Sequence, residues 1–193
     1  MQQKTKKQTQ NSEKQLAVIV VDMQNRFRDC THKGQVVDNV KKLVSWARAQ
    51  GYPVAWTQHH DPDPTSVLSR FWKNDILKDS KDWELMQELK PFVNIQDLRV
   101  TDKTTYDSFM KTNLESWLRE HKVDTVVVCG AMSNLCCETT ARSAFTRGFA
   151  VVFPQDANGT LSHEMQERTV QNIKFGFGKT PSTQELVLSI RPG

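Results

Sequence analysis

The sequence predicts one domain of the α/β class, with helices on both faces of a mainly parallel sheet in a three-layer α/β/α arrangement. Two apolar runs support this prediction, residues 16–21 and 123–130, because neither alternates with polar residues as a half-exposed strand would. Between and after them, strand-like runs alternate with stretches of helical spacing, which is typical of βαβ units. A chain of 193 residues suits one such domain and is too short for two ordinary ones.

The elements follow in order from these patterns. After the strand 16–21, residues 38–50 carry apolar side chains at helical spacing, and Gly51 is a suitable helix end. Residues 52–58 predict a second strand, and residues 59–80, rich in Asp, Pro and Ser, predict a loop over one sheet edge. The elements expected after that loop are a short helix at 83–89, a strand at 97–101, a helix at 108–121, a strand at 123–130, a helix at 136–147, a strand at 149–154 and a helix at 162–175. The tail to Gly193 has no clear pattern.

Right-handed crossovers between these strands would produce a Rossmann-like sheet, in which ligands bind beyond the carboxyl ends of the strands. This rule indicates Asp22, the segment after Gln58 and the segment after Gly130. Neither a G-x-G-x-x-G motif after the first strand nor a P-loop motif occurs in the sequence, so dinucleotide and P-loop nucleotide binding are unsupported.

Composition excludes several classes of protein. The net charge of +4 comes mostly from residues 1–15, a polar, lysine-rich stretch that predicts a disordered leader before a domain at 16–193 and lacks the apolar core of a secretory signal. The near-neutral remainder argues against a nucleic-acid surface, and no apolar run approaches the ~20 residues that span a bilayer. The four cysteines form no C-x-x-C pair, so reduced thiols in a cytoplasmic protein are expected.

Cys136 is the most informative of these cysteines. It follows the strand 123–130 and opens the next predicted helix, where unpaired backbone N–H groups favour a thiolate and can bind an oxyanion. A buried Cys that merely packs as a small apolar residue is the alternative. Its neighbour Cys137 points toward a stripe of small residues and is expected to be inert core.

Asp22 and Lys103 are weaker candidates for chemistry. Asp22 ends a buried strand, where a carboxylate that caps a helix or a turn is the more common alternative. Lys103 follows a short strand, and an ordinary solvated lysine is the alternative there. If both side chains met Cys136 at the sheet edge, the lysine would stabilise a carboxylate and a thiolate together.

A polar cluster follows the second strand. Of His59, His60, Asp61 and Asp63, only the i, i+2 pair His59 and Asp61 could share a metal ion, and no third ligand is obvious, so we expect no metal site. Phe71 and Trp72 in the same loop could line a ligand pocket or could cover the sheet edge.

Four segments of the chain resemble the isochorismatase-like cysteine hydrolase family, which includes nicotinamidases, N-carbamoylsarcosine amidohydrolases and isochorismatases. They are LAVIVVDMQNRF (16–27), TDKTTYDSF (101–109), VVVCGAMSNLCCETTARSAFTRGF (126–149) and QDANGTLSHEMQERTVQNIKFGF (155–177). Each segment is weak alone, but the set in this order and spacing is specific.

The resemblance implies a catalytic triad of Asp22, Lys103 and Cys136 that cleaves a C–N bond through a thioester, with Cys136 as nucleophile and Asp22 as the group that moves the proton. It also implies an oxyanion hole made by the backbone N–H groups of Met132 and Cys136, with a cis peptide bond between Ala131 and Met132. The substrate pocket is expected to include Phe27, His59, Trp72, Tyr106 and Phe109. By analogy, the partners are a small-molecule substrate, without a cofactor, and further copies of the chain in a dimer or tetramer.

The sequence also departs from two branches of the family. Nicotinamidases carry a metal-binding D-W-H-P-x-x-H stretch, whereas the matching stretch here begins His59-His60-Asp61, which favours a metal-free branch. Siderophore and phenazine isochorismatases have Gly at the Cys136 position and use acid catalysis. The presence of Cys136 argues against that mechanism, and hydrolysis of isochorismate through Asp22 is kept as a second hypothesis. A non-enzymatic redox or interaction protein that uses Cys136 and Cys137 is a third.

Overall fold

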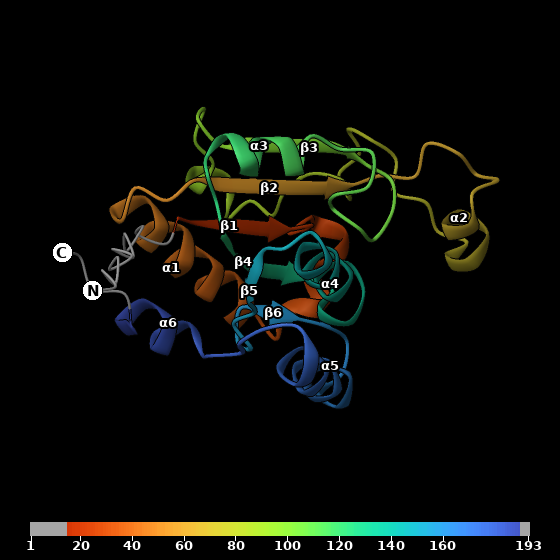
Figure 1. Cartoon of the computed structure of the whole chain (residues 1–193). Coiled ribbons are helices and arrows are strands. Elements are labelled where there is room, and N and C mark those ends of the chain that lie inside the picture. Colours follow the sequence, from red (N-terminus) through yellow and green to blue (C-terminus); the bar gives the residue numbers. More distant parts are fainter. Residues whose placement is uncertain (1–14, 190–193) are drawn as a thin grey trace, which may run out of the picture.

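Within residues 15–189, the sheet has six strands, and every pair of neighbouring strands is parallel. The computed structural model describes residues 15–189, so the predicted leader lies outside the described residues apart from Gln15 (Figure 1). The order of the strands is β3-β2-β1-β4-β5. The short strand β6 also pairs with β4, at Gly130 and Ala131, after the residues of β4 that pair with β5. The strands are β1 (Leu16–Val21), β2 (Val54–His59), β3 (Leu98–Lys103), β4 (Thr125–Ala131), β5 (Ala150–Val152) and β6 (Asn158–Gly159).

Helices connect these strands and cover them. The α-helices are α1 (Gln35–Ala49), α2 (Val67–Trp72), α3 (Leu114–Glu120), α4 (Glu138–Thr146), α5 (His163–Gly176) and α6 (Thr183–Ser189). Three shorter helical turns are η1 (Asn25–Thr31), η2 (Lys90–Phe92) and the π-helix η3 (Ser133–Cys137). None of the helices within residues 15–189 is both long and apolar enough to cross a membrane.

The two apolar runs form the centre of the sheet. β1 and β4 are buried along their whole length and pair from Leu16 with Thr125 to Val21 with Gly130. Because successive side chains of a strand point to opposite faces, each run supplies both faces of the sheet with apolar side chains. The absence of polar alternation in the sequence therefore reflects burial on both sides.

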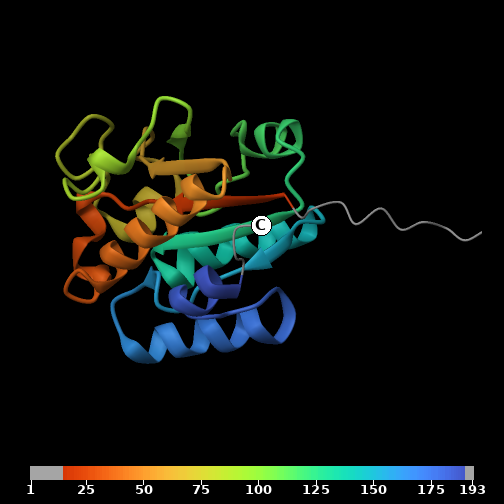
Figure 2. The same cartoon turned by 90° about the vertical axis from the view of Figure 1, so that its left-hand side faces the viewer.

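Each face of the sheet has its own hydrophobic core. On one face, Val18, Val20 and Trp56 pack with α1 and with Leu186 of α6. On the other face, Ala17, Ile19 and Val128 pack with residues of α3, α4 and α5. Figure 2 shows α4 and α5 lying side by side on this second face. The predicted single three-layer α/β/α domain is thus confirmed.

The helix predicted at 83–89 is wrong. This segment forms turns, because Leu85 makes an antiparallel bridge with Gln24 and the Met86 N–H donates to the Met23 carbonyl. The backbone groups that a helix would need are therefore used to hold the segment after β1. Helical structure begins only at η2, which carries Pro91 in its first turn.

The helix predicted at 108–121 begins six residues late, at Leu114. Local side-chain contacts occupy the preceding backbone, since Asp107 accepts from the Phe109 N–H at 2.8 Å and the Thr105 hydroxyl accepts from the Asp107 N–H at 3.2 Å. Such bonds from short polar side chains compete with helix formation.

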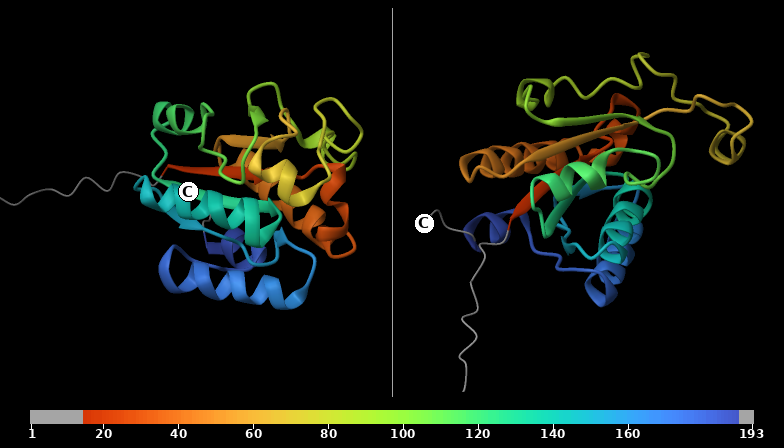
Figure 3. Two further views of the ribbon diagram at one scale, coloured as in Figure 1. Left: turned by 90° about the vertical axis from the view of Figure 1, so that its right-hand side faces the viewer. Right: turned by 45° about the horizontal axis from the view of Figure 1, so that its top comes forward.

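Segments expected to be irregular contain two further helices. Residues 59–80, predicted as a loop, include the six-residue helix α2, whose N-terminus is capped by the Ser66 hydroxyl. Figures 1 and 3 show α2 set apart from the body of the molecule on an extended arm. The tail without a clear pattern contains α6, and β6 was not anticipated.

Candidate active site

Asp22 stands at the carboxyl end of β1 in a backbone conformation that non-glycine residues rarely adopt, with φ of +47°. Its N–H donates to the backbone carbonyl and to the side-chain hydroxyl of Thr57, both at 3.2 Å. Its side chain is fully buried. The neighbouring strand β2 thus fixes the direction in which the carboxylate leaves β1.

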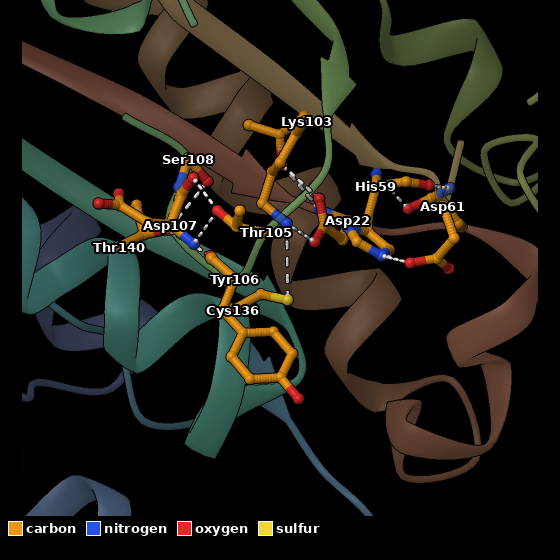
Figure 4. Close-up of polar contacts among 12 residues, drawn as sticks. Asp22, His59, Asp61, Lys103, Thr105, Tyr106, Asp107, Ser108, Cys136 and Thr140 are labelled. Carbon is orange, nitrogen blue, oxygen red and sulfur yellow. Dashed lines mark hydrogen bonds and ion pairs between the residues drawn. The ribbon is translucent and has the colours of Figure 1, made fainter. Parts of the chain in front are cut away.

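Lys103 brings the carboxylate and the thiol together. It ends β3 and is fully buried, with its Nζ 2.6 Å from Asp22 Oδ2 and 3.6 Å from Cys136 Sγ (Figure 4). The three side chains lie at or after the carboxyl ends of three strands that are far apart in the sequence: Asp22 follows β1, Lys103 ends β3 and Cys136 follows β4. The structure therefore brings the three predicted side chains together at one edge of the sheet, and the alternative of a solvated Lys103 is excluded.

Cys136 lies inside a helix rather than at its start. The expected helix at 136–147 begins three residues earlier, with the π-helix η3, and continues into α4. In η3 the Cys137 N–H donates to the Met132 carbonyl at 3.1 Å, and the peptide bond between Ala131 and Met132 is cis. Cys137 itself packs in the core beside Ala141 and Ala144.

The charges of the site favour a lysinium and a neutral thiol. Burial raises the pKa of the Cys136 thiol to about 12, with the Lys103 ammonium lowering that pKa and the Asp22 carboxylate raising it. Burial disfavours the charged form of Lys103, but Asp22 and the Cys136 sulfur together raise the pKa of the lysine above its usual value. The buried cation is thus paired with the Asp22 carboxylate, which can accept the proton of the thiol.

Thr57 is a part of the site that the sequence did not indicate. Its hydroxyl donates to Asp22 Oδ1 at 2.5 Å, while Lys103 holds Oδ2, so both carboxylate oxygens are fixed. Only the strand order could have indicated this residue, because Thr57 lies near the carboxyl end of β2, the strand beside β1. A Thr within a predicted strand is too common to be singled out as a site residue unless the pairing of β1 with β2 is known.

A cavity of about 270 Å³ opens next to Cys136. Four of the five residues predicted for the pocket line it, namely Phe27, His59, Trp72 and Tyr106. Trp72 reaches it from the arm, and its indole N–H donates to the Tyr106 hydroxyl at 2.7 Å. The cavity is also lined by Met132, which was predicted for the oxyanion hole, and by residues that were not predicted, namely Arg26, Asp29, Cys30, Asp61, Leu68, Asn74, Asp75, Ile76, Leu135 and Leu161.

Phe109, the fifth predicted pocket residue, does not line this cavity. Its ring stacks on Phe149 with centroids 6.1 Å apart, and the Arg147 guanidinium lies over its face. The turns at 107–113 direct this side chain into the core under α3 and α4. The placement predicted for Phe109 is therefore corrected.

His59 and Asp61 do not fit a metal site of the kind found in nicotinamidases. His59 Nε2 lies 3.0 Å from Asp61 Oδ1, and Asp61 Oδ2 accepts from the Ile76 N–H at 2.9 Å (Figure 4). Both oxygens of Asp61 and the Nε2 atom of His59 are thus already used in these contacts. In residues 15–189, no group of three or more His, Cys, Asp or Glu side chains could hold a metal ion.

Comparison with known proteins identifies the family. The model of the Isochorismatase domain matches residues 16–185. The chain belongs to the isochorismatase family of hydrolases. This assignment covers almost the whole of the described chain and includes all three residues of the buried Asp22–Lys103–Cys136 cluster.

Relatives in this family include named amidohydrolases. Nicotinamidase 3 of Arabidopsis thaliana is 39% identical over 176 residues, which cover 90% of this chain and 87% of that protein. Ureidoacrylate amidohydrolase RutB of Acinetobacter baylyi is 30% identical over 205 residues, covering 90% and 82%. The crystal structure of a cysteine hydrolase from Pseudomonas syringae pv. phaseolicola has a TM-score of 0.82 at 29% identity and covers 90% of this chain and 91% of that one.

Proposed function

We propose that this family member hydrolyses the C–N bond of a small amide, imide or ureide, with Cys136 as the nucleophile, Asp22 as general base and acid, and Lys103 as the cation that holds both. The observation that carries the proposal is the position of Lys103 Nζ, 2.6 Å from Asp22 Oδ2 and 3.6 Å from Cys136 Sγ. Cys136 also lines a cavity of about 270 Å³, which suits a ligand smaller than a typical drug.

The first half of the reaction forms a thioester. Asp22 takes the proton of the Cys136 thiol as the sulfur attacks the substrate carbonyl carbon, and the carbonyl oxygen becomes an oxyanion. The backbone N–H groups of Met132 and Cys136 stabilise this oxyanion. The tetrahedral intermediate then expels ammonia or an amine, whose nitrogen receives the proton from Asp22.

The second half restores the enzyme. A water molecule gives a proton to Asp22 and attacks the thioester carbon, so the C–S bond breaks and a carboxylic acid leaves. The Cys136 sulfur recovers its proton from Asp22, and Lys103 keeps its charge throughout. As proposed, the cycle uses no cofactor.

The raised thiol pKa supports a transfer that is coupled to attack. With a pKa of about 12, Cys136 is a neutral thiol at physiological pH, so a preformed thiolate is scarce. The reaction then requires a general base that is already positioned in the free enzyme. Asp22, which is fixed by Thr57 and Lys103, is that base. The buried lysinium keeps the carboxylate paired when the proton leaves it.

The test is hydrolysis of a panel of small amides, imides and ureides, followed as ammonia release for primary amides and ureides and as loss of substrate for imides, which release no ammonia. We expect turnover by the native protein, an acyl adduct on Cys136 in mass spectra of the rapidly quenched reaction, and loss of both in Cys136→Ala. Cys137→Ala is the matched control, because that thiol lies next in the chain but, unlike Cys136, does not line the cavity. Turnover that survives Cys136→Ala would overturn the proposal.

The same variants separate the other two hypotheses. If the protein hydrolysed isochorismate by acid catalysis, Cys136→Ala would retain that activity and Asp22→Asn would lose it. If it were a redox or interaction protein, its thiols would react with peroxide, and no member of the amide panel would be hydrolysed. Turnover of the panel that is insensitive to chelator would support the metal-free chemistry.

A further inference from the structure

The wall of the cavity carries more negative than positive charge. Its charged lining residues are the carboxylates of Asp29, Asp61 and Asp75 and the guanidinium of Arg26. Arg26 is directed partly outward, since its Nη1 lies 4.0 Å from Asp82 Oδ2 at the surface. The charge of Lys103, deeper in the site, is matched by Asp22 at 2.6 Å. A ligand in the cavity therefore meets a net excess of carboxylates.

Asp61 is the most deeply placed of these carboxylates. Its side chain is 9% exposed, and both oxygens accept hydrogen bonds, one from the His59 ring and one from the Ile76 N–H. Burial works against ionisation, but these two hydrogen bonds lower the pKa of Asp61 below its usual value. A fixed negative charge thus lies on the cavity wall where water screens it poorly.

The partner of Asp61 holds its carboxylate in place. Because an ionised carboxylate only accepts, His59 Nε2 must carry a proton and donate to it. The other ring nitrogen, Nδ1, is buried and has no hydrogen-bond partner within residues 15–189. Because that nitrogen is out of reach of solvent, the charge that this pair contributes to the cavity wall is the Asp61 carboxylate.

We infer that the cavity selects uncharged amides or ureides that present N–H donors and rejects substrates that carry a carboxylate. A substrate N–H is attracted by the negative charge of Asp61, whereas a substrate carboxylate is repelled by the like charges of Asp29, Asp61 and Asp75. Asp61 acts as the inner determinant, and Asp29 and Asp75 act at the exposed rim. This inference rests on the proposed amidohydrolase function and narrows its substrate class.

A matched pair of ureides tests the inference. N-carbamoylglycine carries a carboxylate, and its N-methylamide is the uncharged equivalent with the same scissile ureide. We expect kcat/KM for ammonia release to favour the N-methylamide by at least about 30-fold at low ionic strength, and by less as added salt screens the rim. Equal or faster turnover of N-carbamoylglycine overturns the inference.

Substitutions of the lining carboxylates test which of them produce the preference for the neutral ureide. Asp29→Asn combined with Asp75→Asn, both at exposed positions where folding is not at risk, should lower the neutral-to-anionic ratio by about tenfold. Asp61→Asn should lower the ratio further. Asp79→Asn, in the same loop but not lining the cavity, is the control and should leave the ratio as it is. An unchanged ratio in both the rim and the Asp61 variants contradicts the assignment.

Binding separates this inference from the reaction on which it rests. Cys136→Ala cannot form a thioester, so calorimetric titration with each ureide measures recognition without turnover. Tighter binding of the N-methylamide supports the inference even if ammonia is never released. Equal or tighter binding of N-carbamoylglycine, or binding of neither compound, overturns the substrate class named here.

Discussion

The ammonium of Lys103 and the carboxylate of Asp22 form an ion pair of 2.6 Å in which neither side chain is exposed to solvent. A buried pair of this kind contributes little net stability compared with apolar residues, but removal of one partner leaves an uncompensated charge in the interior. Lys103 is therefore expected to affect folding as well as chemistry, and the two effects must be measured separately.

Lys103→Met should lower the free energy of unfolding by about 3–5 kcal/mol, because Asp22 would be left buried without its counter-ion. Urea denaturation measures the change. Lys78→Met is a matched control, since Lys78 Nζ also lies 2.6 Å from a carboxylate, that of Asp102, but both side chains are largely exposed. A similar loss in the two variants would show that burial of the pair is unimportant.

Thr57→Val should reduce kcat for the proposed reaction by about tenfold, because Asp22 would lose one of the two contacts that orient its carboxylate. Thr57→Ser keeps the hydroxyl and should retain most of the activity. Steady-state kinetics with a hydrolysed amide distinguish the variants. The role given to Thr57 fails if the serine and valine proteins are equally active.

The thiol of Cys136 should titrate far above pH 9.0, the ordinary value, because burial raises its pKa to about 12. The difference in thiolate ultraviolet absorbance between the native protein and Cys136→Ser, followed with increasing pH, measures this titration. A half-titration at or below pH 9 would contradict the expectation.

The raised pKa of Cys136 also predicts how the free energy of unfolding changes with pH. The folded state holds the Cys136 proton more tightly than the unfolded chain does, so this contribution is fully present below about pH 9 and is lost as the pH rises toward 12. The native protein should therefore lose more stability than Cys136→Ser between neutral and strongly alkaline pH. Urea denaturation of both proteins across that range provides the comparison, and parallel curves would count against it.

Gly130→Ala should destabilise the fold by about 3 kcal/mol or more, since a Cβ would lie 2.1 Å from the Val21 carbonyl oxygen at a φ of +131°. Gly176→Ala, at the end of α5, meets nothing within 4 Å and should change stability by no more than about 1 kcal/mol. Thermal unfolding of both variants checks the contrast. A well-folded Gly130→Ala protein would show that β1 and β4 can separate at this point.

The sequence predicted the centre of the fold and the cluster of Asp22, Lys103 and Cys136 better than the periphery. β1 and β4 are continuous apolar runs, and the rule that ligand sites lie beyond the carboxyl ends of parallel strands indicated Asp22 and the segment that contains Cys136. Spacing alone did not unite them with Lys103, because a lysine after a short strand is ordinarily solvated. The family resemblance added that residue.

Failures of the prediction occurred where tertiary contacts override local pattern. The segment around Leu85 has helical spacing, but its backbone bonds to Met23 and bridges Gln24, a residue far away in the sequence. Phe109 belongs to the matching segment 101–109, yet hydrogen bonds from Thr105 and Asp107 turn the chain there. Asp61 was considered only as a metal ligand, because its contact with Ile76 depends on how the arm folds back.

The strand order places the earliest described strand beside one that is synthesised much later. Leu16 of β1 can pair with Thr125 of β4 only after β4 has been synthesised. Asp22 can pair with Lys103 only after β3 has joined the sheet through β2. Such high contact order makes assembly slow and leaves apolar β1 unpaired on a nascent chain. A polypeptide truncated before β4 would therefore hold an aggregation-prone strand and no reactive centre, so production of active protein should benefit from chaperones that shield β1 until β4 has been synthesised.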